Sequence, residues 1–312
     1  MKKAVFLLLI FIISACSKEK YNTYHFFALG TIVDITIQEK YADYLPEIIN
    51  YMNNLADNIS NNEKIINQAE INSRIHVSED LLNILERADF YYNINHKYDP
   101  TSYTVSSLYG FPEGPYIIPS KEKINTAKKY AGFSNILLKD NTVIKKSPLL
   151  VDFSANAKGY IVDKTVSYMK SKSLDNFIIN AGGDLFISGM KNKIYFNTGI
   201  INPDNKSKPL SIINITNKAV ATSGNYERYF IMNNKYINHI FEGVTFEPVN
   251  NYKSVSVIAE NTEKADGFST LFYLLDMNEI TNYCKKFDIA VLILTNNNKI
   301  VKFCNWEKYE KL

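Results

Sequence analysis

The strand and helix patterns of this chain are grouped rather than alternating, and this grouping most constrains the fold. Five consecutive segments are typical of strands, and none is separated from the next by a pattern of helical length. They are "NFIIN", "LFISG", "KIYFNTGII", "LSIINIT" and "AVATS", between residues 176 and 223. Parallel neighbours need a crossover of a dozen or more residues, usually a helix, so such a run favours antiparallel pairing. We therefore expect an α+β fold of mixed, mainly antiparallel strands with clustered helices.

The rest of the chain has the same grouped character. Helical patterns cover 43–59, 79–95, a segment opened by Pro119-Ser120, 157–172, 263–276 and a further stretch to 287. Strand patterns cover 25–37, a hairpin that turns at Asp140-Asn141, 253–259, 289–295 and 299–304. No internal repeat, low-complexity tract or Pro/Gly/Ser-rich linker divides these elements. The sequence predicts one compact domain, which we place at 24–312.

The N-terminus has the three parts of an export signal. Two lysines precede an unbroken apolar run of ten residues, 4–13, which is about half the length needed to span a bilayer. The run ends in Ile13-Ser14-Ala15-Cys16, which resembles the bacterial lipobox, in which the cysteine is lipidated. We expect a signal peptide at 1–15, a tether at 16–23, and a lipoprotein anchored at Cys16 in the bacterial envelope outside the cytoplasm. The alternative is an ordinary secretory signal with an incidental cysteine.

Charge and cysteine usage exclude some classes of function. The formal net charge is +3, and removal of Lys2 and Lys3 with the signal leaves 33 basic residues against 32 acidic ones. Such a balance does not predict binding to nucleic acid. No histidine or cysteine has zinc-ligand spacing. The sequence does not indicate whether Cys284 and Cys304 pair.

Two polar segments carry candidate chemistry for a phosphate-bearing ligand. In "VDFSANAKGYIVD" a strand ends at Asp152, and small residues with Lys158 lead into a helix, whose N-terminus favours phosphate. In "EKADGFSTLFYLL" Asp266 and Thr270 lie four apart on one helix face, as hard oxygen ligands suited to Mg²⁺. Taken alone, the second pair is more typical of a solvated carboxylate and a helix-facing threonine.

The stretch "NAGGD" allows two interpretations. Asn, Gly-Gly and Asp between the strands at 177–180 and 185–187 are typical of a tight hairpin turn. The same glycines also suit a backbone that a ligand approaches closely.

Taken together and in order, the polar segments resemble the ApbE family, the FAD:protein FMN transferases. The resemblance rests on "FALGT", "YDPTSYTVSSLYGF", "VDFSANAKGYIVD", "NAGGDLFISG", "AVATSGNYERYF", "NHIFEG" and "SVSVIAENTEKADGFST". It extends from about Leu29 to the terminal strands. It implies a single ApbE-like domain that binds FAD beside Mg²⁺, transfers FMN to a threonine hydroxyl of a partner protein, and releases AMP.

The resemblance also implies roles for individual residues. Asp266, Thr270 and the backbone carbonyl of Ala155 match the metal ligands, and His239 matches the motif histidine, the expected proton acceptor. The positions that match FAD contacts are Leu29, Lys97, Tyr98, Asp99, Asp152, Lys158 and Phe241.

One loop departs from the family pattern. Where the family usually has Ile-Asp-Pro-Arg-Thr-Gly, this chain has "FEGVTFEP" at 241–248, so the arginine is replaced by Val244. Valine cannot bind phosphate as a guanidinium does, which puts turnover or acceptor recognition in doubt. Tyr109 in "LYGF" replaces the common tryptophan and keeps a flat ring. Two alternatives therefore stay open, namely an FAD pyrophosphatase that gives FMN and AMP, and a non-catalytic flavin-binding lipoprotein.

Overall fold

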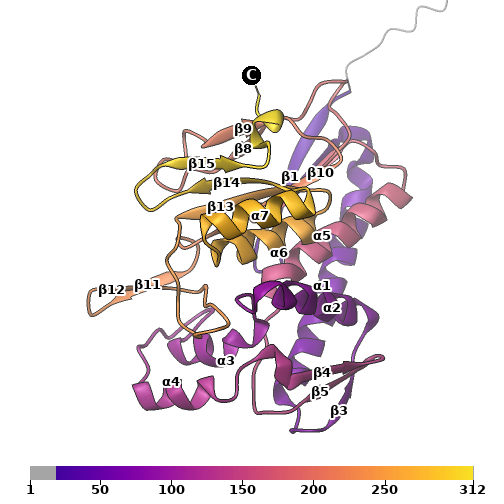
Figure 1. Cartoon of the computed structure of the whole chain (residues 1–312). Coiled ribbons are helices and arrows are strands. Elements are labelled where there is room, and N and C mark those ends of the chain that lie inside the picture. Colours follow the sequence, from indigo (N-terminus) through magenta and orange to yellow (C-terminus); the bar gives the residue numbers. More distant parts are fainter. Residues whose placement is uncertain (1–18, 312) are drawn as a thin grey trace, which may run out of the picture.

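An eight-stranded sheet, antiparallel at every pairing, runs through the centre of the computed structural model, which describes residues 19–311 (Figure 1). The strand order is β1-β2-β6-β7-β10-β13-β14-β15. Their bounds are β1 Tyr21–Ala28, β2 Thr31–Gln38, β6 Phe177–Ala181, β7 Asp184–Ser188, β10 Lys218–Gly224, β13 Ser254–Ala259, β14 Ala290–Leu294 and β15 Ile300–Phe303. The expected signal peptide and Cys16 lie outside the described residues.

Helices cover one face of this sheet and a small β-layer covers the other. The helical layer consists of α1 (Leu45–Gln68), α2 (Glu79–Asn95), α5 (Ser154–Ser171), α6 (Thr262–Tyr273) and α7 (Met277–Phe287). On the opposite face, β8 (Thr198–Ile200) and β9 (Ser211–Ile213) bury a second apolar cluster around Trp306. The α+β class, the single domain and the mainly antiparallel pairing are confirmed.

Smaller elements lie beside the helical layer. A three-stranded sheet has the order β3-β5-β4, with β3 at Arg74–His76, β4 at Ile136–Lys139 and β5 at Thr142–Lys145. Two short helices, α3 (Tyr103–Ser106) and α4 (Lys121–Lys128), pack near a separate hairpin of β11 (Tyr229–Met232) and β12 (Lys235–Asn238). In α4 the Ser120 side chain caps the helix, as its sequence predicts.

Several elements differ from the sequence expectation, among them the strand expected to end at Asp152, because β5 ends at Lys145 and residues 146–153 form no strand. The strand expected at 25–37 is two strands, because the chain folds back at Leu29-Gly30, where both residues have positive φ (+55° and +68°). The long strand patterns at 193–201 and 210–216 pair over only three residues each. The hairpin at 229–238 was not expected, although Asn233 and Asn234 both have positive φ, which suits a two-residue turn.

The pairing of Cys284 with Cys304, which the sequence leaves open, is made in the structure, with a sulfur–sulfur distance of 2.04 Å. Cys284 lies in α7 and Cys304 follows β15, so the bond ties the last helix to the last strand. Among residues 19–311, no helix is both long enough and apolar enough to cross a membrane.

Candidate functional site

A cavity of about 960 Å³ opens between α1, α5, α6 and the ends of several strands. With the exception of Lys97, every predicted site residue in the described part of the chain contributes to its wall. These are Leu29, Tyr98, Asp99, Asp152, Ala155, Lys158, His239, Phe241, Asp266 and Thr270. The fold therefore brings together segments that are far apart in the sequence.

The candidate cation position lies where α5 and α6 pack closely. The Gly159 N–H donates to Asp266 Oδ2 at 2.9 Å. A regular helix would give that N–H to the Ala155 carbonyl, so this carbonyl has at most a shared donor. A Cβ at Gly159 would lie 2.6 Å from the Thr262 carbonyl oxygen, so only glycine permits this approach of the two helices.

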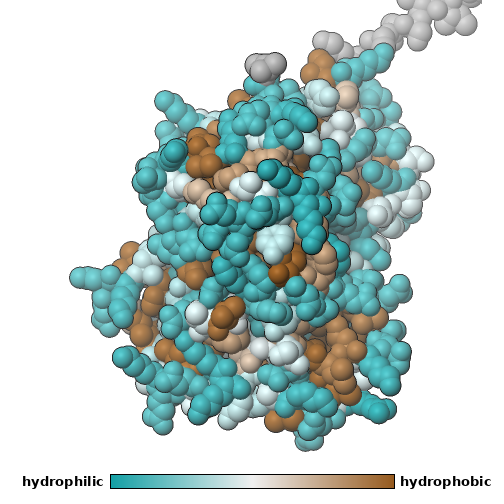
Figure 2. Space-filling view, viewed as in Figure 1, coloured by the Kyte–Doolittle hydropathy of each residue, from teal (hydrophilic) through white to brown (hydrophobic). Residues whose placement is uncertain are grey.

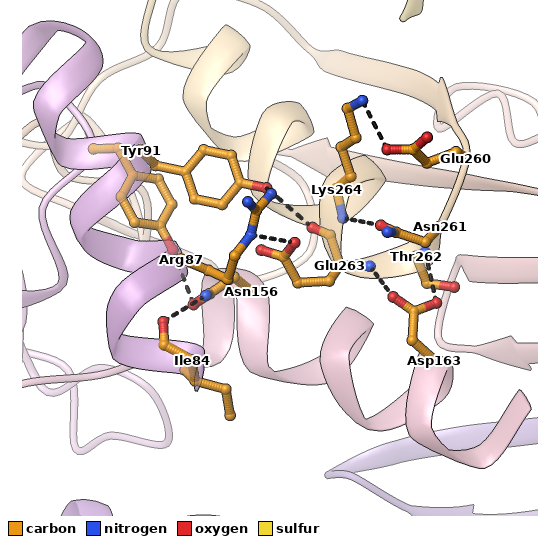
Figure 3. A network of polar contacts seen from close by, with 11 residues as sticks. Ile84, Arg87, Tyr91, Asn156, Asp163, Glu260, Asn261, Thr262, Glu263 and Lys264 are labelled. Atoms are coloured by element: carbon orange, nitrogen blue, oxygen red, sulfur yellow. Dashed lines mark hydrogen bonds and ion pairs between the residues drawn. The ribbon is translucent and has the colours of Figure 1, made fainter. Parts of the chain in front are cut away.

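A polar network holds the first turn of α6 in place (Figure 3). The Asp163 carboxylate on α5 accepts from the backbone N–H groups of Thr262 and Glu263, at 2.7 and 2.8 Å. From α2, Arg87 forms an ion pair with Glu263 at 2.8 Å, and the Tyr91 hydroxyl donates to the Glu263 carbonyl. The helix that carries Asp266 is therefore fixed to both of its neighbours.

The charges around Asp266 fit a bound cation. Lys158 forms an ion pair with buried Asp184 at 2.8 Å. Burial, and then the charge of Asp184, raise the pKa of Asp266 well above its usual value, although Lys158 and the Gly159 N–H oppose this rise. Because Lys158 pairs with Asp184, a divalent cation would compensate the negative charge of the other carboxylate, Asp266. No cluster of three or more acidic, histidine or cysteine side chains with metal-holding geometry occurs in 19–311, so such a cation would draw on Asp266, the Thr270 hydroxyl and the Ala155 carbonyl.

His239 is held in one tautomer beside the cavity. Its Nδ1 lies 3.1 Å from the Arg228 carbonyl oxygen, which only accepts hydrogen bonds, so Nδ1 carries the hydrogen. This leaves Nε2 as the nitrogen that can accept a proton. Burial lowers the pKa of His239 to about 4, so the ring is neutral at pH 7.

Three predicted contact residues have structural partners. The Asp99 carboxylate accepts from the backbone N–H groups of Thr101 and Phe133, at 2.7 and 3.0 Å, so it organises its own loop. The Tyr98 hydroxyl donates to Asn156, and burial raises its pKa well above the usual value. Lys97 lies outside the cavity wall and pairs with Glu279 at 3.2 Å.

The Gly-Gly stretch combines both interpretations of the sequence. Ala181 pairs with Asp184, so Gly182 and Gly183 form a two-residue hairpin turn, with φ of +61° and +106°. Both glycines also line the cavity. A Cβ at Gly182 would lie 2.5 Å from Thr31 Oγ1, whereas one at Gly183 would meet nothing within 4 Å.

The atypical 242–248 loop lies outside the cavity wall. At Gly243 the loop packs against the 96–99 segment, where the Gly243 N–H donates to the Lys97 carbonyl at 2.7 Å. Val244 is 60% exposed and does not line the cavity. Tyr109 packs behind the wall, against Phe241 at 5.3 Å between ring centroids. Neither Val244 nor Tyr109 lines the cavity.

Because of this placement, we expect Val244→Arg to leave turnover and FAD affinity within about twofold of the wild type, since exposed substitutions rarely shift energies by more than ~0.5 kcal/mol. Steady-state turnover and FAD titration of the two proteins are the measurements. A tenfold gain in turnover would show that this loop reaches the cavity.

Several wall residues escape the sequence motifs. One face of α1 contributes Asn53, Asp57, Ser60 and Glu63, which recur at spacings of three and four, so a polar helical stripe could have indicated them. The Glu63 carboxylate accepts from the Phe153 N–H at 3.0 Å; burial, and then the charge of Asp152, raise its pKa to about 8.

Two further basic side chains line the cavity. Arg228 and His239 both line the cavity, and the Arg228 carbonyl contacts the His239 ring. Lys206 belongs to the loop between β8 and β9. Arg228 stands in the motif "AVATSGNYERYF", although no role was predicted for it, whereas Lys206 has no sequence signal that would have singled it out.

Fold and site together define an α+β protein with one deep, charged cavity suited to a large phosphate-bearing ligand. The chain belongs to the ApbE family, whose model matches residues 29–293, which confirms the resemblance inferred from the motifs.

Curated relatives include the FAD:protein FMN transferase of Vibrio cholerae, 32% identical over 178 residues, which cover 55% of this chain and 53% of that protein. That of Haemophilus influenzae is 26% identical over 309 residues, covering 93% and 89%. Several alignments span only about half to two thirds of the relatives' length. The crystal structure of the ApbE protein of Thermotoga maritima superimposes with a TM-score of 0.84 at 25% identity, over 94% of this chain and 100% of that one.

Proposed function

We propose that this protein transfers the FMN moiety of FAD to a threonine hydroxyl of an acceptor protein, with Mg²⁺, and releases AMP. The observation that carries the proposal is that one cavity holds a candidate cation position, a half-buried lysine and a neutral histidine. The relatives' names, FAD:protein FMN transferase, support transfer of FMN from FAD to a protein.

The reaction assigns a task to each group. The threonine oxygen attacks the FMN phosphorus, the bond from that phosphorus to the bridging oxygen breaks, and AMP leaves with the bridging oxygen. The threonine proton passes to His239 Nε2, and Lys158 offers positive charge near the phosphates. A Mg²⁺ held by Asp266, Thr270 and Ala155 would shield charge on the phosphate oxygens.

The proposal is tested by incubating the protein with FAD, Mg²⁺ and an acceptor polypeptide that carries an Asp-x-x-Thr sequence. We expect mass spectrometry to show a covalent FMN increment on the threonine, with one AMP released for each FMN transferred. Release of free FMN and AMP without the increment would identify a pyrophosphatase. Bound FAD that stays intact would identify a flavin-binding protein without turnover.

Lys158 should contribute mainly to FAD binding. We expect Lys158→Ala to raise the dissociation constant for FAD by about tenfold or more, because one charged hydrogen bond is worth roughly 1.5–3 kcal/mol. Fluorescence titration at two salt concentrations measures this effect. Lys164→Ala is the matched control, since Lys164 lies on the same helix but pairs with Asp80 outside the cavity. Equal affinity for all three proteins would contradict the assignment.

We further propose that the chain is exported and anchored through a lipid on Cys16. The lipobox-like sequence supports this, and the Cys284–Cys304 disulfide agrees with an oxidising compartment. Metabolic labelling with palmitate should mark the wild type and not Cys16→Ser. Equal labelling of both proteins would rule out this anchor.

A further inference from the structure

The hairpin of β11 and β12 connects two residues of the cavity wall. Arg228 directly precedes β11 and His239 directly follows β12. The His239 N–H also donates to the Arg228 carbonyl, which closes the base of the hairpin. The hairpin projects from the rest of the molecule in Figure 1. Anything that binds along it therefore lies next to the candidate base.

The two faces of this hairpin differ. Phe230 and Ile237 on the inner face are buried in an aromatic cluster. On the outer face Tyr229, Ile231 and Tyr236 are 46%, 67% and 37% exposed. Ile231 lies opposite Tyr236, and Tyr229 stacks on Tyr236 with centroids 4.8 Å apart, so the three form one apolar surface. Figure 2 shows hydrophobic residues along the hairpin and hydrophilic ones at its tip.

A second hollow of about 380 Å³ continues this surface. Tyr236 belongs to both, and the Tyr236 hydroxyl donates to the Asn225 carbonyl at 2.7 Å. Pro203 and Tyr226 line this hollow and the main cavity as well. The outer face of the hairpin, the hollow and the FAD cavity therefore adjoin one another.

The chemistry of the hollow suits a polypeptide. Its wall includes the amides of Asn225, Asn250 and Asn296. Asn250 Oδ1 accepts from Asn225, while Asn250 Nδ2 and Asn296 Oδ1 make no hydrogen bond with any residue the structure describes. Free amide donors and acceptors beside tyrosine rings match the backbone and apolar side chains of a peptide.

The charge of the hairpin indicates which charge a bound partner segment would carry. The hairpin itself, 229–238, carries Lys235 and no aspartate or glutamate. Arg228 precedes it, and Glu227 and Glu242 lie at its base, so the positive charge of the projecting part is that of Lys235. The one acidic residue of the hollow, Asp204, is neutralised by Lys253 at 2.6 Å. A segment with a negative side chain next to its apolar residues is therefore electrostatically complementary.

We propose that the outer face of the hairpin and the second hollow form the docking surface for the acceptor protein. The occupant is an extended acidic segment that carries the threonine, with its apolar side chains on Tyr229, Ile231 and Tyr236 and its backbone at the asparagine amides. This inference rests on the proposed transfer of FMN to a protein. It assigns acceptor selection to the outer tyrosines and Ile231 of the hairpin and to the asparagine amides, none of which lines the main cavity.

Two substitutions test the surface. Ile231→Glu places a charge on the apolar face, and Asn250→Asp keeps the acceptor for Asn225 while replacing the free donor with an anionic oxygen. The probe is a fluorescein-labelled 16-residue peptide with an Asp-x-x-Thr sequence. We expect each variant to raise its dissociation constant, by anisotropy, and its KM in transfer by at least about tenfold, with kcat and FAD affinity unchanged.

Ile194→Glu is the matched control, because Ile194 is 70% exposed and lines neither hollow. The docking proposal fails if Ile231→Glu and Ile194→Glu bind the peptide equally well, or if the wild type does not bind it. Peptide binding without FMN transfer would refute the proposed reaction and keep the docking surface. Sedimentation completes the test. If the wild type self-associates and Ile231→Glu does not, this face binds a second copy of the chain instead of an acceptor.

Discussion

Replacing His239 by alanine should lower kcat by roughly 10²–10⁴-fold, the usual contribution of a positioned general base, while FAD affinity changes little. Proton removal from the acceptor stabilises the transition state and not the bound ground state, so the two quantities separate. Turnover and FAD titration measure them. His25→Ala is the control, because His25 lies on β1 and pairs with Asp34 away from the cavity. Equal turnover for wild type and His239→Ala would leave no role for histidine in the reaction.

The same residue sets an expected pH profile. Histidine ordinarily titrates near 6.5. Burial lowers the pKa of His239 to about 4, so its neutral, proton-accepting form persists below pH 6. Turnover should therefore hold as pH falls through 6.5 and decline only toward pH 4. A loss of activity centred at 6.5 would mean that the imidazole is solvated as in free histidine.

Asp266→Asn should abolish Mg²⁺-dependent turnover and also the stabilisation of the protein by Mg²⁺. Wild type in excess Mg²⁺ should melt at a higher temperature than in EDTA, because a ligand at 100 times its dissociation constant adds about 2.7 kcal/mol. The variant should show no such difference. Glu260→Gln, an exposed change just before α6, should respond as the wild type does.

The apo stability of this variant gives an independent check. The pKa of Asp266 is raised in the folded protein, so its ionisation costs stability as pH rises above the unfolded value near 4. Removing the carboxyl removes that cost. Without metal at pH 7, Asp266→Asn should therefore melt no lower than the wild type. A clearly lower melting temperature in EDTA would show that the carboxylate is needed for the fold itself.

The sequence is informative where chemistry is carried by short contiguous segments. Asp152 stands just before α5, Lys158 lies near the start of that helix, and Asp266 lies between Ala265 and Gly267 in α6; all three line the cavity. Amphipathic spacing predicted a buried face of Leu81, Leu85, Ala88 and Tyr92 for the helix at 79–95. The first three are buried in α2, whereas Tyr92 is half-buried. Such features are local, so one sequence suffices to find them.

Features that depend on distant partners were missed. Lys97 faces Glu279, far along the chain, and no local pattern indicates that ion pair. The carboxylate of Asp99 is occupied by backbone donors, which its motif does not reveal. The departure at 241–248 puts turnover or acceptor recognition in doubt from the sequence, and no local pattern indicates that Gly243 places this loop on the 96–99 segment. Tertiary placement decided each of these cases.

The cavity wall is drawn from positions as far apart as Leu29 and Leu274. Contacts of such long separation close late in folding, because loop-closure entropy must be overcome first. A fragment that lacks either end of this range therefore lacks part of the cavity wall, and a partly folded chain does not form the proposed FAD site. The fluorescence of bound flavin should consequently report completed folding. We expect destabilising mutations far from the cavity to lower the occupancy of the FAD site before secondary structure is lost.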